Sequence, residues 1–299
     1  MIQLVPVETE EEFQILLRLE GMIFADAGLR RFPVHNPCAV TDRWLFGNPA
    51  EVFRYAYLFA LKGEYIGYAM AYNLYPGGKK FALALLPEGV QYAGEALRLI
   101  EGLSARGNKR AALYINTLDK KLVRAARKRG YRRQRKPARC QMALDLSLYQ
   151  EMPVLWEHET LARLSPADFA DRALYSKIAT GCRTTAERYE ELYRGEYYRA
   201  ARDYAIRAND GTYAGHLLWW LDASGRTASL EIVATVPEYR RRGIMRRAIA
   251  EGLNMLKAEG VRYAYVSTSA KNKPAQALYR DAGFARLGKT YLFEKRVKG

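Results

Sequence analysis

The sequence repeats itself at an interval of about 150 residues, and this repeat limits the folds that the chain can adopt. The segment GEYIGYAMAY, beginning at Gly63, resembles GTYAGHLLWW, beginning at Gly211. Further matches follow in the same order: Pro87-Glu88 with Pro237-Glu238, Glu101-Gly102-Leu103 with Glu251-Gly252-Leu253, and Gly130-Tyr131 with Gly283-Phe284. Ordered matches whose offset drifts slowly are typical of duplicated domains. We therefore predict tandem copies of one fold, covering residues 1–150 and 151–299.

The order of predicted elements indicates an α/β fold in each copy. In the second copy, Ser165 with Asp168 marks the start of one helix, and Thr184 with Glu187 resembles a capping box for another. Three strands follow, then a helix over about 241–259, a strand, a second helix and a closing strand. The predicted order is β-α-α-β-β-β-α-β-α-β, and the first copy repeats it. We expect two mixed, mostly antiparallel sheets, each flanked by helices.

Composition and cysteine usage exclude several classes of protein. Hydrophobic residues make up 49% of the chain and charged residues 27%, as in ordinary globular domains. No signal peptide is visible, and no apolar stretch approaches the ~18 residues of a membrane span, so we predict a cytoplasmic protein with no membrane partner. The cysteines are odd in number and widely separated, and the histidines share no ligand-like spacing with them: Cys38, Cys140, Cys182, His35, His158 and His216. We therefore predict reduced thiols and no metal site.

A turn rich in arginine, between a predicted strand and a predicted helix, is the segment most suggestive of a binding site. The strand TASLEIVATV runs through Pro237 into Arg240-Arg241-Arg242-Gly243-Ile244-Met245-Arg246. The start of a helix offers unpaired N–H groups and the positive end of the helix dipole, and glycine lets the backbone approach a ligand closely. The alternative is a solvated basic turn, but cations at a helix start oppose the dipole unless an anion is present. The pattern favours a pyrophosphate site.

Two motifs in the second copy resemble those of the GNAT superfamily of acyl-CoA N-acyltransferases. The turn is similar to the family's motif R/Q-x-x-G-x-G/A, with Met245 in place of the last small residue. The segment from Asn272 to Phe284 resembles the family's N-x-x-A-x-x-L-Y-x-x-x-G-F. The two motifs stand at the family's spacing on the expected elements. The resemblance covers about 145 residues well, and the first copy only weakly.

The resemblance implies an acetyltransferase that uses acetyl-CoA and acetylates a primary amine by direct attack in a ternary complex. It implies that the backbone of Val233, Ala234 and Thr235 pairs with the pantetheine arm. It also implies contacts between the cofactor and Arg241, Arg242, Gly243, Ile244, Met245, Arg246 and Asn272. Tyr279 should protonate the departing thiolate, which suits a phenol of pKa about 10 and a thiol of about 8.5. Glu231 is the predicted general base; the alternatives are an edge carboxylate that faces solvent and a water chain.

The first copy departs from these motifs at the positions that matter for catalysis. Ala126 stands opposite Tyr279, and Phe81 stands opposite Glu231. The segment from Gln91 to Ala96 fits R/Q-x-x-G-x-A in letters, but it is slipped by one residue and would point Glu95 at the phosphates. We predict a degenerate, non-catalytic first copy that shapes the substrate pocket or the assembly.

The chain carries a formal net charge of +16, which the two copies share. Residues 120–139 contain 11 basic residues and no acidic one. Such a run is either a solvated surface, which we favour because both copies are basic, or a docking patch for an anionic partner such as nucleic acid. A docking patch would fit two alternatives to a simple acetyltransferase. One is an enzyme associated with aminoacyl-tRNA or RNA, and the other is a non-catalytic acyl-CoA-binding module.

The amine acceptor cannot be named from the sequence. In the family that the chain resembles, the acceptor is recognised by the region of the first two helices, here about residues 175–198. That region combines tyrosines and glutamates: Tyr189, Tyr193, Tyr197, Tyr198, Glu187, Glu190 and Glu191. These side chains would suit a small or peptidic cationic amine, and they would equally suit a packed helix. The sequence does not indicate an oligomeric state.

Overall fold

The structure is a computed structural model, and it describes residues 1–27, 55–72, 80–105, 110–195, 198, 201–222 and 225–297. Two compact units can be distinguished. Unit 1 comprises Met1–Met142, Ser267–Gln276 and Arg286–Gly299, and unit 2 comprises Ala143–Val266 and Ala277–Ala285. Two segments of the C-terminal half thus belong to unit 1. The division into copies at residue 150 stays a prediction. His35 and Cys38, which bear on the predictions of no metal site and of reduced thiols, lie outside the described residues.

Unit 1 is built on a mixed sheet in which the strand order is β1-β2-β3-β4-β5-β13. Neighbours are antiparallel except β4 and β5, which run parallel over Lys80–Ala82 and Ala112–Tyr114. The short β6 pairs with β13, and β7 also lies beside it. The strands are β1 (Gln3–Pro6), β2 (Ala56–Leu61), β3 (Glu64–Tyr72), β4 (Lys80–Leu85), β5 (Arg110–Asn116), β6 (Arg132–Arg133), β7 (Arg139–Asp145) and β13 (Ala285–Arg296).

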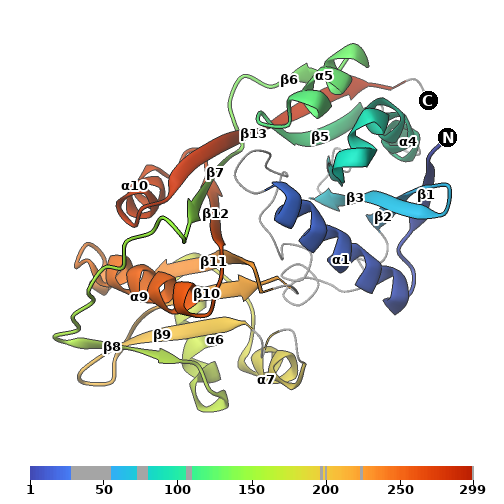
Figure 1. The fold of residues 1–299 in the computed structure, drawn as a ribbon. Helices are drawn as coiled ribbons and strands as arrows, with labels where there is room; N and C mark the ends of the chain where they lie inside the picture. Colours follow the sequence, from blue (N-terminus) through green and yellow to red (C-terminus); the bar gives the residue numbers. More distant parts are fainter. Residues whose placement is uncertain are drawn as a thin grey trace. The chain divides into compact units, whose positions relative to one another are not determined.

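Helices cover both faces of this sheet (Figure 1). The helix α1 (Glu10–Ala27) packs Phe13 and Leu16 against one face of β2, β3 and β4. The 3-10 helix η1 (Pro87–Tyr92), α4 (Ala93–Ala105) and α5 (Lys120–Lys128) cover the other face. Alternate strand residues face opposite sides of a sheet, so two apolar layers form from single strands.

Unit 2 repeats this plan with the strand order β8-β9-β10-β11-β12. The strands are β8 (Glu159–Arg163), β9 (Arg202–Ala208), β10 (Tyr213–Leu221), β11 (Thr227–Thr235) and β12 (Tyr263–Ser269). The helices are η2 (Pro166–Asp168), α6 (Phe169–Thr180), α7 (Ala186–Arg194), η3 (Pro237–Tyr239), α9 (Ile244–Ala258) and the part of α10 (Lys273–Asp281) that follows Gln276. Only β11 and β12 run parallel among the paired strands.

The faces of β10 show which helices lie on each side of this sheet. Gly252 of α9 approaches the indole nitrogen of Trp219, whereas Trp220 packs edge-on against Tyr198. On the same side as Trp220, His216 meets Ser176 of α6. The helix α9 therefore covers one face and α6 the other (Figure 1). The predicted α/β fold class, a mixed and mostly antiparallel sheet flanked by helices, is confirmed.

Local differences from the predicted elements are small. Ser165 and Asp168 form a capping box at the helix start that was predicted there. The cap of α7 is Thr185, whose hydroxyl accepts a hydrogen bond from the Arg188 N–H, so the choice of Thr184 was wrong by one residue. The helix predicted over 241–259 begins only at Ile244, because Arg241 and Gly243 take left-handed backbone conformations that end the helical path.

Candidate active site

A bulge in β11 changes the course of the strand at the predicted cofactor edge. Leu218 pairs with Glu231 and Leu217 with Val233, so Ile232 has no partner on β10. Ile232 has a φ of 54°, which an isoleucine adopts only under constraint from its surroundings. The parallel pairing with β12 covers Thr227 to Leu230 and ends just before this bulge. The last part of β11, which contains Val233, Ala234 and Thr235, therefore pairs with β10 on one side only among the described strands.

The turn between β11 and α9 has a backbone suited to holding an anion. Arg241 has a φ of 64° and Gly243 a φ of 76°, so left-handed residues alternate with Arg242 just before the helix. Successive N–H groups in such conformations form a concave, anion-binding nest. No side chain caps Gly243, and the first turn of α9 carries no acidic residue. An added Cβ at Gly243 would meet only the Arg247 guanidinium, at 3.6 Å, so the turn is open.

The arginines around this turn fall into two groups. Arg240 is structural, because its Nε donates to the carbonyl of Thr235 (3.1 Å) and its Nη2 reaches the carbonyl of Ala179 at the end of α6 (3.5 Å). Arg247 is paired with Glu159 at 2.8 Å. By contrast, Arg241, Arg242 and Arg246 are exposed and have no carboxylate partner among the described residues. These three side chains are available to an anion at the helix start.

Ile244 and Met245 contribute backbone rather than side chain to the turn. Both are buried, and the methyl group of Met245 lies 3.4 Å from the position that a Cβ on Gly215 would take. Met245 thus packs under the sheet and does not obstruct the turn, although the family motif has a small residue there. An added Cβ at Gly215 would also approach the carbonyl oxygen of Ala234 to 2.7 Å. Gly215 was not among the predicted site residues. It is identified as a neighbour of the predicted cofactor edge only because it pairs with Thr235 in the strand register.

Glu231 lies at the start of the bulge and shares a sheet face with α6. Its cross-strand partner Leu218 lies on the same face of β10 as His216 and Trp220, and directly paired residues share a face. The Glu231 carboxylate accepts a weak hydrogen bond from the hydroxyl of Ser229, two residues earlier, at 3.5 Å. The side chain is half-buried. This carboxylate therefore lies on the face of the sheet that α6 covers.

Tyr279 and Asn272 both lie on or beside α10. Tyr279 is buried, and its ring packs edge-on against Phe284 with centroids 6.2 Å apart. Asn272 caps the helix, since its Oδ1 accepts from the Ala275 N–H at 3.2 Å. That capping contact gives Asn272 a structural role, and its predicted contact with a cofactor stays a prediction.

A buried polar cluster joins α6 to the sheet on the Glu231 face. Arg172 of α6 is fully buried and pairs with Asp203 of β9 at 3.2 Å, and the Tyr198 hydroxyl donates to the same carboxylate at 2.7 Å. Ser176 contacts both the Arg172 guanidinium and His216. Burial raises the pKa of Asp203 against the opposing effect of Arg172, and burial followed by the Arg172 charge lowers the pKa of His216 well below its usual value. His216 is therefore neutral, and the cluster fixes α6 in place.

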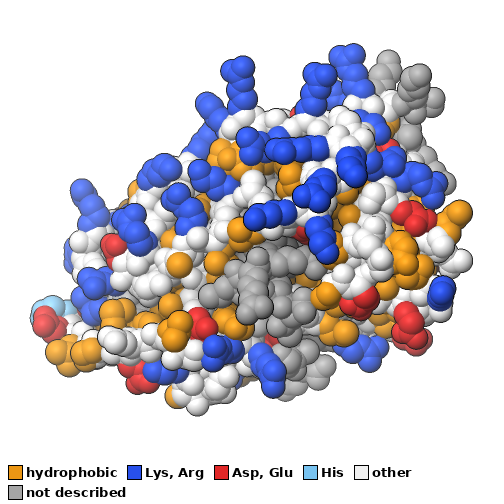
Figure 2. All heavy atoms as spheres, turned by 45° about the horizontal axis from the view of Figure 1, so that its top comes forward, with side chains coloured by type: hydrophobic (Ala, Val, Ile, Leu, Met, Phe, Trp, Pro, Cys, Tyr) orange, Lys and Arg blue, Asp and Glu red, His pale blue; other side chains and the backbone are white. Residues whose placement is uncertain are grey.

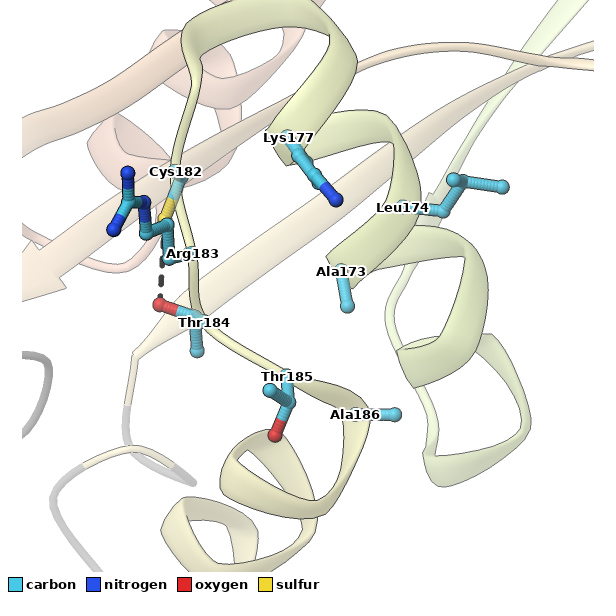
Figure 3. Close-up of a pocket in the computed structure, with 8 residues that line it drawn as sticks. All are labelled: Ala173, Leu174, Lys177, Cys182, Arg183, Thr184, Thr185 and Ala186. Atoms are coloured by element: carbon cyan, nitrogen blue, oxygen red, sulfur yellow. Dashed lines mark hydrogen bonds between the residues drawn. The ribbon is translucent and has the colours of Figure 1, made fainter.

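A pocket of ≈ 610 Å³ opens between α6 and α7 (Figure 3). Lys177 points toward it from α6, and the Cys182 thiol lies 3.3 Å from the Thr184 hydroxyl in the connecting loop. Of the tyrosines predicted to serve as an acceptor surface, Tyr189 and Tyr198 are buried and pack against Phe169, Trp220 and each other, whereas Tyr193 is exposed. Tyr197 lies outside the described residues. The packed-helix interpretation therefore holds for Tyr189 and Tyr198.

Other predicted features can be checked only in part. Among the described residues, no three His, Cys, Asp or Glu side chains gather as a metal site requires, and Cys140 and Cys182 are free thiols. No helix in the described ranges is long and apolar enough to cross a membrane.

Comparison with known proteins finds similarity in the C-terminal half of the chain. Residues 172–284 match the family model described as Acetyltransferase (GNAT) family. A mycothiol acetyltransferase from Clavibacter michiganensis is 36% identical over 78 residues, which cover 26% of this chain and 25% of that protein. The chain thus aligns with only a quarter of the length of this curated relative.

Solved structures show the same fold over the whole chain. A tandem GNAT protein from the clavulanic acid biosynthesis pathway superposes with a TM-score of 0.65 at 16% identity, covering 100% of this chain and 99% of that one. A GNAT-family acetyltransferase from Colwellia psychrerythraea gives a TM-score of 0.66 at 15% identity, covering 99% and 100%. At these identities, the likeness establishes the fold alone.

Proposed function

We propose that the chain transfers an acetyl group from acetyl-CoA to a primary amine, because residues 172–284 match the family model described as Acetyltransferase (GNAT) family. The observation that carries this proposal is the open left-handed turn at Arg241 and Gly243, which lies before an α9 helix free of acidic residues in its first turn. A diphosphate would fit this turn, because the backbone N–H groups and the three arginines that have no carboxylate partner among the described residues would supply charge-assisted hydrogen bonds. The mycothiol acetyltransferase match supports acetyl as the acyl group.

The remaining residues would act on the two protons of the reaction. Acetyl-CoA, when bound, supplies the acetyl thioester. As the amine nitrogen bonds to the acetyl carbon and the carbon–sulfur bond breaks, Glu231 takes the proton that the amine loses, directly or through water. Tyr279 gives its phenolic proton to the sulfur. The edge of β11 at Val233, Ala234 and Thr235 would hold the pantetheine arm through its backbone.

The acceptor would enter on the side of the sheet that carries Glu231, α6 and α7. The carboxylate faces that side, and Arg240 ties the end of α6 to the end of β11. The pocket between α6 and α7 begins beside this link, at Lys177 and Cys182. We therefore place the amine acceptor, small molecule or peptide, in this region.

The test combines binding with turnover on the full chain. Titration calorimetry with CoA should give one site per chain, and a panel of amines should include at least one that releases free CoA thiol from acetyl-CoA. Failure to bind CoA would refute the proposal. Binding without thiol release from any amine would replace it with the non-catalytic acyl-CoA-binding module.

A further inference from the structure

Unit 1 carries a concentrated basic surface that the proposed acetyl transfer does not use. A hollow of ≈ 710 Å³ is lined by Arg110, Gly130, Arg132, Arg133, Gln134, Glu294, Lys295 and Arg296. The last turn of α5 adjoins it through Gly130 and adds Arg127 and Lys128. We call this set of residues the basic end of unit 1. Figure 2 shows Lys and Arg side chains gathered over this part of the molecule.

The strand registers place three of these arginines on one face of the sheet. Arg296 pairs with Arg110, Glu294 pairs with Ala112, and Arg132 pairs with Glu294 from the other side. Alternation along β13 therefore puts Arg110, Arg132 and Arg296 on the face of Glu294. Lys295 lies on the opposite face and forms an ion pair with Glu101 at 3.0 Å. Two arginines directly across a strand pair repel each other, which is unfavourable unless a ligand supplies negative charge.

In the part of the chain that the structure describes, no carboxylate forms an ion pair with these three arginines. Among the described residues, Arg110, Arg132 and Arg296 form no ion pair and no side-chain hydrogen bond. Glu294, the one carboxylate lining the hollow, accepts instead from the amide of Gln134 at 2.8 Å. By comparison, Arg129 nearby is paired with Glu101 at 2.7 Å, so this region does neutralise the arginines that serve the fold.

The chemistry of the basic end fits phosphate better than a membrane surface. Membrane-binding surfaces combine cations with exposed apolar side chains that enter the lipid. The exposed large hydrophobic residues of the described chain lie elsewhere: Met1, Met22, Leu148, Leu155, Leu174, Ile178 and Tyr193. Guanidinium groups hold phosphate with paired, directional hydrogen bonds. A surface made mainly of arginines without apolar neighbours therefore suits a phosphate backbone.

The aromatic rings near the hollow are not available to stack on bases. Tyr131 is buried, and the Tyr291 ring is covered by the Arg133 guanidinium at 4.5 Å. Proteins that hold single strands use exposed rings for this purpose, whereas contacts to phosphates need none. We propose that the basic end of unit 1 docks the phosphate backbone of a double-helical nucleic acid without reading its sequence.

The experiment measures the affinity of the full chain for a short RNA duplex of arbitrary sequence by fluorescence anisotropy, between about 50 and 200 mM salt. The logarithm of the association constant should fall linearly with the logarithm of salt concentration. In the triple variant Arg110→Gln, Arg132→Gln and Arg296→Gln, this slope should decrease by about 2 to 3, because each lost phosphate contact removes about 0.9.

A matched control removes the same charge from elsewhere in unit 1. Arg18, Lys62 and Arg98 are exposed and lie outside the basic end, so their triple replacement by glutamine should leave the slope unchanged. An equal decrease in both variants, or no decrease in the first, would overturn the proposal. So would wild-type binding to polyglutamate or to phosphatidylserine vesicles at least as tight as binding to RNA. CoA affinity should be unaffected in both variants, which separates this proposal from that of acetyl transfer.

Discussion

The same strand-to-helix junction occurs in both units, and only one copy has a backbone that suits an anion. In each unit, a strand leads to a Pro-Glu pair and a helix, and the strand runs parallel to the next strand in the chain. The Leu86 N–H donates to the Ile66 carbonyl just as the Val236 N–H donates to the Ala214 carbonyl. The two units therefore share the order of elements at this junction and one matching backbone hydrogen bond.

The differences lie in the backbone and in the charge at the helix start. The register of β3 with β4 continues without a shift, and η1 runs directly into α4. In unit 2, Ile232 bulges out of β11, and the left-handed Arg241 and Gly243 open the turn before α9. Glu95 lies in the first turn of α4 and accepts a hydrogen bond from the Ile2 N–H at 3.1 Å, where α9 has no acid. The copies thus share what packing requires and differ in what binding requires.

The charge at the helix start provides the strongest test of this contrast. Arg242→Glu should weaken CoA binding by about 1000-fold, or about 4 kcal/mol, since a charge-assisted bond is lost and a carboxylate then faces phosphate. Calorimetry measures this loss. Arg98→Glu, on the exposed side of α4, is the matched reversal in unit 1 and should leave binding unchanged. Equal losses, or a second CoA site per chain, would contradict the assignment of binding to unit 2.

The helix that follows differs between the units at one position. Tyr279 of α10 corresponds to Ala126 of α5, which is fully buried in an apolar core. Tyr279→Phe should lower kcat by roughly 10- to 1000-fold and leave acetyl-CoA affinity nearly intact, because only proton donation is removed. Steady-state kinetics and calorimetry on the same preparation measure the two quantities. Wild-type turnover in the variant would leave Tyr279 as a packing residue against Phe284.

The bulged strand provides the next contrast, between Glu231 and the buried Phe81. Glu231→Gln keeps the shape and the Ser229 contact but cannot accept the proton. We expect kcat to decrease by about 100-fold, the lower end for loss of a general base, with CoA affinity unchanged. An unchanged kcat with a good amine substrate would show that water alone removes the proton.

Sequence reasoning predicted the parts of this contrast that local pattern determines. The element order of unit 2, the turn and the cap at Ser165 follow from hydrophobic periodicity and capping residues. The bulge at Ile232 could not be predicted, because cross-strand register rather than residue type imposes its φ. The same applies to β13, which pairs with β5 across a sequence separation that no local pattern encodes. Arg240 belongs to the arginine-rich turn in the sequence, yet its carbonyl acceptors are visible only once the chain is folded.

The smallest expected effect concerns the glycine on which the turn depends. Gly243 has a φ of 76°, so Gly243→Ala places a Cβ in a backbone conformation that costs about 1 to 2 kcal/mol. Since space is open around it, the cost is conformational rather than steric. If the turn keeps its shape only in part, CoA affinity should fall by about 5- to 30-fold, as calorimetry would show.

Gly94, near the start of α4, is the matched control in unit 1. It lies inside a helix with open space around its Cβ position, so Gly94→Ala should stabilise the protein by up to about 1 kcal/mol and leave CoA affinity unchanged. Thermal unfolding of both variants separates the two effects, because the alanine at 243 should lower the unfolding temperature and the alanine at 94 should raise it. If Gly243→Ala kept full affinity, the left-handed turn would not be what distinguishes unit 2 from unit 1. Binding would then rest on the arginine side chains alone.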